Sequence, residues 1–377
     1  MQHYAYVVIG GGCAGLSLAA ELARRGLYRR GLLVLEQRER YERDRTWCHW
    51  DAVRHGFEGA VARSWRRWSV RHGGEEIAHG PGRFQYREIP ADRFYHSALA
   101  LLRDRAEIRH PCRVDRIARD GDAWILETDG GRVAATHVFD SRPPDRPARF
   151  LQHFVGKEVL LDRSALDPCT AVLMDFDVPQ DRGIHFMYVL PRDERRAFVE
   201  ATWFGPHPHP RAVYDESIAG FLEQRYRAAA CEVRFEEEGA IPMDAAVRAQ
   251  PEGPGHYPIG TAGGLVKPST GYAFLDIQRW SHQMAAQLAL RDLPSPPRTR
   301  RPGFTTLDRI FLSFLRHHPE RAPEVFAGMF RSNSPESTVR FLTETASPTT
   351  VLRVVSSMPS LPFLREAMRI AARESPP

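Results

Sequence analysis

A glycine-rich turn near the start of the chain limits the folds that this sequence can adopt more than any other feature. Residues 4–9 (YAYVVI) form an almost continuous apolar run, which is typical of a strand buried in a parallel sheet. The pattern Gly10-x-Gly12-x-x-Gly15 follows at once, and apolar residues at helical spacing then fill 16–25. The order of strand, glycine turn and helix predicts the first part of a Rossmann-type dinucleotide-binding unit.

Each glycine of this turn has a physical task. Gly10 permits the tight turn, Gly12 lets the backbone approach a pyrophosphate, and Gly15 lets the helix pack closely on the strand. The free N–H groups at the start of the helix favour a phosphate there. A second apolar strand over 32–35 ends at Glu36, whose carboxylate is placed to accept hydrogen bonds from a ribose hydroxyl.

The acidic residue at position 36 also bears on the choice of nucleotide. It disfavours a 2′-phosphate, so NADP is not expected at this site. The spacing does not separate FAD from NAD, and a glycine turn without any ligand is the plainest alternative.

The length of the chain and a change in its texture predict more than one domain. At 377 residues the chain exceeds the size at which one core usually stops growing, so we expect two closely joined domains. Asp129-Gly130-Gly131 marks a hairpin, and 138–140 reads as a strand end. From 154 to 240 the pattern predicts a mostly antiparallel sheet with one helix, suited to covering a substrate. The strands are expected at 171–176, 185–190, 197–203 and 232–235, the helix at 213–229, and further helices at 307–315 and from 338 onward.

Composition excludes several classes of protein. The 52 Lys and Arg residues against 47 acidic ones give a charge of +5 from scattered arginines, without a compact nucleic-acid motif. The five cysteines form no C-x-x-C pair, so neither a disulfide framework nor a zinc site is expected, and a reducing cytosol fits best. His207 and His209 stand in a proline-rich loop without other ligands, so no metal is expected there either. The first residues lack the basic region of a signal peptide. The sequence also contains no run of about 20 uncharged apolar residues, which is the length needed to span a bilayer.

Residues 259–274 read IGTAGGLVKPSTGYAF, and this segment resembles the motif G-T-A-G-G-x-x-K-P-S-T-G-Y-x-F of the flavin-dependent lycopene cyclase family of bacteria. Residues 44–50 (DRTWCHW) resemble its D-R-T-W-C-F-W, with His49 in place of Phe. Residues 197–203 (AFVEATW) resemble the strand that carries its essential glutamate. Further similar segments are 185–191 (HFMYVLP), 240–243 (AIPM) and 361–364 (LPFL).

The resemblance implies an α/β fold of the glutathione-reductase-like flavoproteins. It has a Rossmann-type FAD-binding domain, a mostly antiparallel β-sheet substrate domain and a helical C-terminal region. We expect the FAD-binding domain at 1–80, 96–150 and 255–290, the substrate-binding domain at 81–95 and 151–254, and the helical region at 291–377.

The resemblance also implies a reaction. FAD would act in its reduced form, with NADPH as reductant, and lycopene would pass through γ-carotene to β-carotene without net redox change. Because lycopene dissolves in lipid, we expect a cytoplasmic protein in peripheral contact with the inner face of the cytoplasmic membrane. The stretch 361–372 places Arg365 and Arg369 among apolar residues, as an interfacial helix does, although a packed C-terminal helix would look the same.

The reaction implied by the resemblance closes a ring on the end of lycopene. Ring closure requires an acid, a base and a means of stabilising a carbocation. Glu200 is the candidate catalytic residue, because its apolar surroundings in the sequence would raise the carboxyl pKa and keep a proton available. A glutamate facing outward from a strand is the plainer alternative, and alternation along the strand does not decide between them. The candidate cofactor-binding residues are Gly10, Gly12, Ala14, Gly15, Glu36, Arg45, Gly263, Gly264, Lys267, Thr270 and Gly271.

Several other residues have more than one plausible interpretation from the sequence. Lys267 fits a flavin contact and a solvated lysine equally well. Asp140-Ser141-Arg142 is expected near the adenine or in a surface turn, and Glu236-Glu237-Glu238 at a solvated strand end. The candidates for lining a polyene tunnel, for which core packing is an equal alternative, are Trp47, Trp50, Tyr188, Trp203, Tyr272 and Phe274.

Two other functions fit the same sequence. An FAD-dependent monooxygenase, halogenase or isoprenoid reductase would consume NAD(P)H in proportion to product. A carotenoid- or flavin-binding protein without catalysis would be unaffected by Glu200→Gln. The sequence does not decide the number or type of rings formed, nor the oligomeric state.

Overall fold

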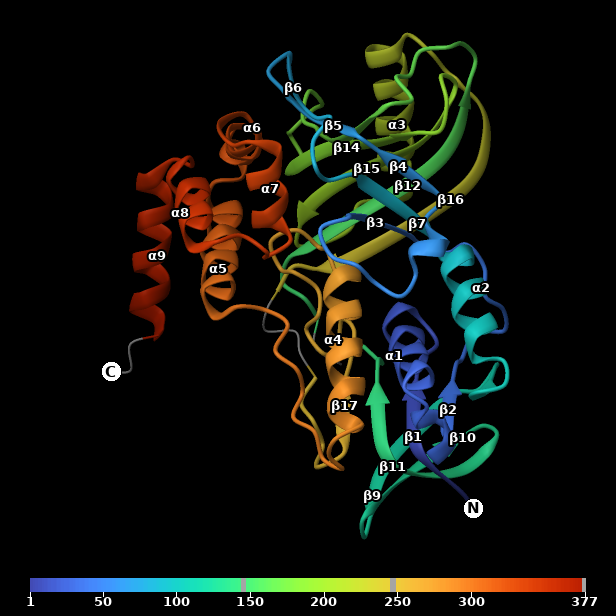
Figure 1. Ribbon diagram of the computed structural model, residues 1–377. Coiled ribbons are helices and arrows are strands. Elements are labelled where there is room, and N and C mark those ends of the chain that lie inside the picture. Colours follow the sequence, from blue (N-terminus) through green and yellow to red (C-terminus); the bar gives the residue numbers. More distant parts are fainter. Residues whose placement is uncertain (144–146, 245–248, 375–377) are drawn as a thin grey trace.

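The computed structural model describes residues 1–143, 147–244 and 249–374, and its first sheet is built around the glycine turn (Figure 1). The strand order is β8-β2-β1-β11-β10-β9, and β17 lies beside β11. The pairs among β8, β2, β1, β11 and β17 are parallel, whereas β10 pairs antiparallel with β11 and β9. The strands are β1 (Gln2–Ile9), β2 (Leu32–Leu35), β8 (Glu107–Arg109), β9 (Val114–Asp120), β10 (Ala123–Thr128), β11 (Gly131–Asp140) and β17 (His256–Pro258).

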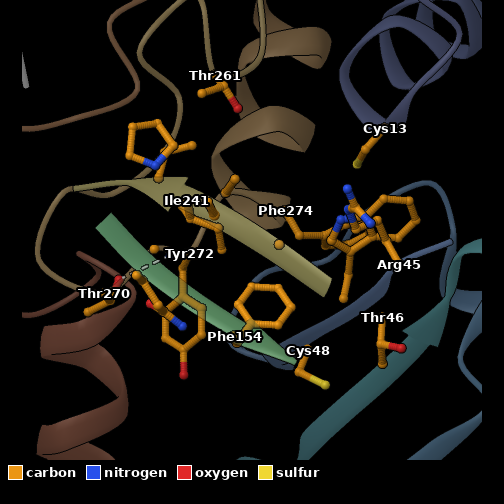
Figure 2. A pocket seen from close by; sticks show the side chains of 18 of the residues that line it. Cys13, Arg45, Thr46, Cys48, Phe154, Ile241, Thr261, Thr270, Tyr272 and Phe274 are labelled. Carbon is orange, nitrogen blue, oxygen red and sulfur yellow. Dashed lines mark hydrogen bonds between the residues drawn. The ribbon is translucent and has the colours of Figure 1, made fainter. Parts of the chain in front are cut away.

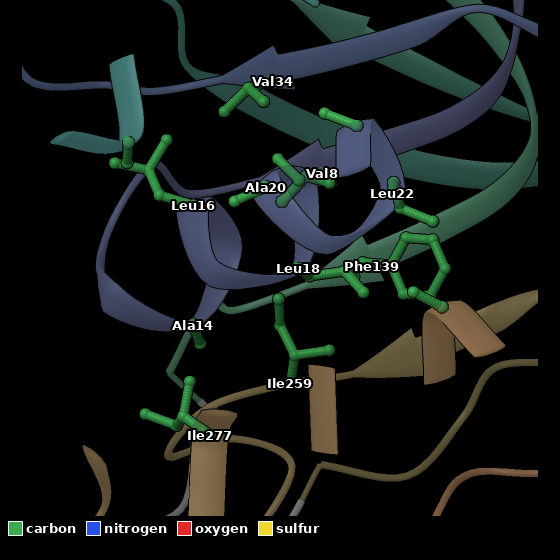
Figure 3. Close-up of a cluster of buried hydrophobic side chains, with 14 of the residues drawn as sticks. Val8, Ala14, Leu16, Leu18, Ala20, Leu22, Val34, Phe139, Ile259 and Ile277 are labelled. Carbon is green, nitrogen blue, oxygen red and sulfur yellow. The ribbon is translucent and has the colours of Figure 1, made fainter. Parts of the chain in front are cut away.

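Three helices cover one face of this sheet: α1 (Cys13–Arg24), α2 (Ala91–Leu102) and α4 (Phe274–Leu288). Figure 3 shows the core between them, in which Val8 and Val34 of the sheet meet Leu16 and Ala20 of α1. Ile277 of α4 joins the same cluster. The strands β1 and β2 are buried on both faces, which explains why they read as continuous apolar runs.

The second sheet has the strand order β16-β12-β15-β14-β13-β5-β6. Its pairs are antiparallel except for β13 with β5. Helix α3 (Arg211–Tyr226) packs on one face, and the C-terminal helices pack on the other. The strands are β5 (Arg67–His72), β6 (Glu75–His79), β12 (Leu151–Leu161), β13 (Thr170–Asp175), β14 (Ile184–Pro191), β15 (Arg196–Gly205) and β16 (Ala230–Pro242).

A small third sheet and the C-terminal helices complete the described chain. The sheet has the order β3-β7-β4, with β3 (Thr46–Trp50), β4 (Arg63–Trp65) and β7 (Tyr86–Pro90). The helices are α5 (Pro302–His317), α6 (Ala322–Ser332), α7 (Pro335–Leu342), α8 (Pro348–Ser356) and α9 (Ser360–Glu374). The short 3₁₀ helices are Leu27–Arg30, Glu58–Ala60 and Pro319–Arg321.

The pairing of the strands and the packing of α2 differ from the expected domain boundaries. Strand β7, expected in the substrate-binding domain, pairs with β3 and β4, which were expected in the FAD-binding domain. Residues 67–79, expected in the FAD-binding domain, form β5 and β6 of the second sheet. Residues 91–95, expected in the substrate-binding domain, begin α2, which packs on α1. The reason is that β5 pairs with β13, about a hundred residues later in the chain, and no local pattern marks a partner so distant.

The expectations for single turns and helices agree more closely with the structure. The hairpin at Asp129 is confirmed, since Thr128 pairs with Gly131 across β10 and β11. The helix expected at 213–229 is observed as α3, Arg211–Tyr226. The helical stretch from 338 onward is divided among α7, α8 and α9, and Ser347 caps α8 directly before Pro348; residues 375–377 of that stretch lie outside the described residues.

Candidate functional site

The glycine turn joins β1 to α1 under tight steric limits. Gly10 has φ +90°, and a Cβ there would lie 2.0 Å from Ser141 Oγ. A Cβ on Gly15 would lie 1.9 Å from the carbonyl oxygen of Gly10. Gly12 differs, because the atom nearest to its hypothetical Cβ is Arg38 Nη2 at 3.9 Å. Gly12 is also the N-cap of α1 without a capping side chain, so the open space beside it meets free helical N–H groups.

Glu36 braces this turn from the end of β2. Its carboxylate accepts hydrogen bonds from the backbone N–H of Gly11 at 2.6 Å and of Arg38 at 2.8 Å. Burial alone would raise the pKa of Glu36, but the hydrogen bonds from Arg38 and Gly11 hold it below its usual value. The carboxylate is therefore charged and fixed beside the turn, and its expected bond to a ribose hydroxyl stays a prediction.

The loop between β17 and α4 is the second glycine-rich element. A Cβ on Gly263 would lie 2.5 Å from the carbonyl oxygen of Pro258, and Gly264 has φ +73°. These two glycines shape the turn itself. Thr270 and Gly271 line the cavity, and Thr270 Oγ1 accepts a hydrogen bond from the backbone N–H of Tyr272 at 3.3 Å (Figure 2).

A cavity of about 760 Å³ joins the two glycine loops to the second sheet. It begins at Gly12, Cys13 and Ala14, passes Arg45 and β3, and ends against α6 and α7. In Figure 2, Cys13 and Thr270 lie on opposite sides of the lining residues, with the rings of Phe154 and Tyr272 between them. Its size is within the range of small-molecule sites, and its walls are largely apolar and aromatic.

Glu200 lies in this cavity. Alternation along β15 turns Val199, Ala201 and Trp203 towards α3, and it turns Phe198 and Glu200 towards the cavity side. The Glu200 side chain accepts a hydrogen bond from Thr202 Oγ1 at 2.5 Å.

This environment changes the acidity of Glu200. The residue is 8% exposed. Burial, and then the charge of Glu237, raise its pKa to about 8, although the hydrogen bond from Thr202 acts to lower it. The alternative of an outward-facing glutamate is therefore excluded, and the group holds a proton at neutral pH.

Glu237 is a second buried carboxyl in the same cavity, which the sequence did not reveal. We expected it at a solvated strand end, but only its neighbours Glu236 and Glu238 are exposed. Glu237 is 7% exposed and accepts a hydrogen bond from Thr46 Oγ1 at 2.6 Å. Burial raises its pKa to about 7, against the hydrogen bond from Thr46 and the charge of Arg45. Strand alternation was the available signal, because the middle of three strand residues must face away from its neighbours.

Lys267 is committed to a buried ion cluster and does not line the large cavity. Its ammonium donates to Asp308 and Glu344, each at 2.9 Å, and Arg300 contacts the same two carboxylates. The side chain is 6% exposed, so the expectation of a solvated lysine is wrong. A flavin contact would have to compete with both ion pairs.

Five of the six candidate tunnel aromatics line the cavity, namely Trp47, Trp50, Tyr188, Tyr272 and Phe274. Trp203 does not, because alternation places it on the other face of β15. There it stacks on His185 with ring centroids 3.7 Å apart, beside Tyr214 of α3.

The remaining candidates have structural partners. The carboxylate of Asp140 accepts from Arg142 at 2.7 Å; burial would raise its pKa, but hydrogen bonds from His256 and Arg142 lower it to about 2. Ser141 lines the cavity near Gly12. His209 packs against Trp203, and no group of three or more His, Cys, Asp or Glu side chains in the described part of the chain is arranged to hold a metal.

Comparison with known proteins identifies relatives over the whole chain. The model of the lycopene cyclase protein family matches residues 6–368. A lycopene beta-cyclase of Paracoccus sp. (strain N81106 / MBIC 01143) is 28% identical over 301 residues, covering 71% of each chain. A lycopene beta-cyclase of Pseudescherichia vulneris is 25% identical over 395 residues, covering 98% of this chain and 97% of that one.

Solved structures share the fold at low identity. A geranylgeranyl bacteriochlorophyll reductase-like protein of Thermoplasma acidophilum gives a TM-score of 0.63 at 14% identity, covering 98% of this chain and 99% of that one. A flavoprotein/dehydrogenase of Cytophaga hutchinsonii gives 0.59 at 13% identity, covering 99% and 100%. These likenesses bear on the fold alone, and they confirm the expected α/β fold of flavoproteins with a Rossmann-type FAD-binding domain.

Proposed function

Because the chain belongs to the lycopene cyclase protein family, we propose that it closes β-rings on the ends of lycopene, by way of γ-carotene, to give β-carotene. The reaction is an isomerisation, in which one proton enters and one proton leaves for each ring. The observation that carries the proposal is Glu200, a buried carboxyl that keeps its proton at neutral pH in an apolar, aromatic cavity.

The residues around the cavity have separate tasks in this proposal. Protonated Glu200 delivers a proton to the terminal double bond of the polyene and creates a tertiary cation. The neighbouring double bond attacks that cation, which closes the six-membered ring. Trp50 and Tyr272 offer aromatic faces to the positive charge, and the largely apolar walls keep water away from it.

FAD is the proposed cofactor, and the residues at the glycine turn fit it. The open space beside Gly12, the uncapped start of α1 and the charged Glu36 match a pyrophosphate and a ribose. When bound in its reduced form, FAD would supply negative charge that stabilises the carbocation. NADPH is the proposed source of electrons for keeping it reduced.

The C-terminal helix α9 supports the proposed contact with a membrane. Leu361, Leu364 and Met368 are 68%, 56% and 57% exposed and follow helical spacing, with the exposed Arg365 among them. The opposite face of the helix packs inward through Phe363, which stacks on Phe314 of α5 at 4.5 Å. No helix in the described ranges is long and apolar enough to cross a bilayer. We therefore propose peripheral attachment of a cytoplasmic protein to the inner face of the cytoplasmic membrane.

Anaerobic incubation tests the function. Purified protein is mixed with FAD, dithionite and lycopene in lipid vesicles, without nicotinamide, and the pigments are separated by chromatography. We expect γ- and then β-carotene from catalytic amounts of reductant. Unchanged lycopene, together with oxidation of NAD(P)H on another substrate, would instead favour a monooxygenase or isoprenoid reductase.

A further inference from the structure

Glu237 and Glu200 occupy one row of the second sheet. Gly156 of β12 is paired with Glu200 of β15 on one side and with Glu237 of β16 on the other. Residues directly opposite each other on neighbouring strands point to the same face, so both glutamates face the cavity. Two strand spacings place their backbones about 10 Å apart.

The residue between them has no side chain, and it is covered by a ring. A Cβ on Gly156 would lie 2.1 Å from the ring of Phe198. A larger residue there would displace this ring. The glycine therefore allows an apolar group to cover the strand that separates the two carboxyls.

Each carboxyl is held by its own threonine. Thr202 donates to Glu200 at 2.5 Å from the same strand, whereas Thr46 donates to Glu237 at 2.6 Å from β3. The two groups are therefore fixed separately on either side of Gly156, and both line the cavity.

Their charged surroundings differ. Arg45 and Arg43 act on Glu237 and favour its ionised form, whereas the groups acting on Glu200 are the carboxyl of Glu237 and the hydroxyl of Thr202. Burial raises the pKa of Glu237 to about 7 and that of Glu200 to about 8. Between about pH 7 and 8, Glu237 is therefore the more ionised of the two carboxyls, and Glu200 is the one that more often carries a proton.

We propose that Glu237 is the catalytic base, and that its carboxylate removes the proton whose loss fixes the position of the ring double bond. This assignment rests on the proposed function. Glu200 gives one proton to one carbon of the terminal double bond, which leaves a tertiary cation on the other carbon. The new carbon–carbon bond closes the ring and moves the positive charge to a ring carbon, and Glu237 takes one proton from the ring carbon next to it. The electron pair of that C–H bond becomes the ring double bond, so atoms and charge balance without oxidant or reductant. A proton returned from Glu237 to Glu200 through solvent resets the pair.

Glu237→Gln tests the base directly. We expect FAD absorbance and lycopene binding to match the wild type, and β-ring formation to fall at least about 100-fold. The cation would still form on Glu200, so the remaining product should include rings with the double bond at another carbon, or hydroxylated rings. Glu237→Asp should restore part of the rate. The matched control is Glu238→Gln, whose side chain is 73% exposed, and it should behave as the wild type.

Other outcomes would overturn the assignment. If the Glu237→Gln protein makes only β-rings, at a rate within about threefold of the wild type, Glu237 is excluded as the catalytic base, because a general base usually contributes about 100-fold or more to the rate. The assignment would also be overturned if the only change were a shift of the pH–rate profile to lower pH. In that case the effect of Glu237 on the reaction would be limited to raising the pKa of Glu200. A wild type that makes no rings at all would refute the function, and with it the assignment.

Thr46→Val provides an independent test if Glu237→Gln fails to fold. It removes the hydroxyl that fixes Glu237 and leaves the carboxyl in place. We expect a lower rate with misplaced double bonds among the products. Rings of unchanged type formed at the wild-type rate would contradict the role of Glu237.

Discussion

At the scale of single residues, the cavity keeps the carboxyl group of Glu200 protonated at a pH where exposed carboxyl groups are ionised. Burial and the charge of Glu237 raise the pKa of Glu200 from 4.5 to about 8. In an unfolded chain the same group ionises near its ordinary value. The stability that Glu200 contributes is therefore fully present below about pH 4.5 and is lost as pH rises through about 8.

Glu200→Gln should show this linkage and the catalytic role together. The melting temperature of the variant should equal that of the wild type near pH 5 and exceed it by several degrees near pH 9, because glutamine cannot ionise. Ring formation should fall at least about 100-fold at every pH. Thermal melts and pigment chromatography across this range measure both effects. A constant difference in melting temperature would contradict the raised pKa.

The glycines of the turn should separate folding from cofactor binding. Gly12→Ala adds a methyl group into open space, so the melting temperature of the cofactor-free protein should be unchanged while the dissociation constant for FAD rises about tenfold or more. Gly15→Ala forces a methyl group against the Gly10 carbonyl and should destabilise the fold by about 1–3 kcal/mol. Fluorescence titration with FAD and urea unfolding distinguish them. Equal effects of both substitutions on folding would refute the separation.

The sequence predicted residues of the site wherever local spacing carries the chemistry. The glycine turn, Glu36 and the candidacy of Glu200 follow from motifs within about 30 residues of chain. Glu237 was missed because its role depends on its row in the sheet, and that row is set by pairing with Gly156, 81 residues earlier. Trp203 was a tunnel candidate with core packing as an equal alternative, and it packs in the core. Alternation fixes the two faces of a strand without naming which one is the cavity.

At the scale of elements, a buried ion cluster joins the second glycine loop to the C-terminal helices. Asp308 of α5 accepts from Lys267 at 2.9 Å and from Ser269 at 2.6 Å, and Glu344 follows α7. Arg300, just before α5, contacts both carboxylates. Two cations and two carboxylates thus balance in this cluster, which explains why such charges are tolerated in the interior.

Asp308→Asn should therefore destabilise the fold. Loss of one carboxylate leaves the two buried cations with Glu344 as the one ion-pair partner that they share, and the expected cost is about 3–5 kcal/mol. Urea unfolding monitored by tryptophan fluorescence measures it. The control Asp181→Asn changes a side chain that is 72% exposed and should alter stability by less than about 0.5 kcal/mol. Equal changes in the free energy of unfolding of both variants would show that the cluster contributes no net stability.

At the scale of the whole molecule, the cavity lies where the two large sheets and the C-terminal helices meet. Helix α9 lies at one side of the molecule (Figure 1). The α/β fold of flavoproteins was predicted from the sequence and from the family resemblance. The membership of β5 and β6 in the second sheet was not, since it depends on contacts between distant parts of the chain.

A triple substitution tests the membrane face. Changing Leu361, Leu364 and Met368 to serine should release the protein from sedimenting anionic vesicles, because their apolar surface would no longer enter the lipid. Activity on lycopene in vesicles should fall with it, while FAD binding is unchanged. Val233→Ser, at a 45% exposed position on β16, is the control and should leave sedimentation unchanged. Binding that survives the triple substitution would place the contact elsewhere.

The most direct test of ring closure by proton transfer is the mass of β-carotene formed in D₂O. Protein, reduced FAD and lycopene are incubated anaerobically in D₂O, and mass spectrometry counts the deuterium in each product. Glu200 exchanges its proton with solvent, so we predict one deuterium for each ring and no net consumption of reductant. Rings without deuterium, or reductant consumed in proportion to product, would contradict acid catalysis by a buried carboxyl.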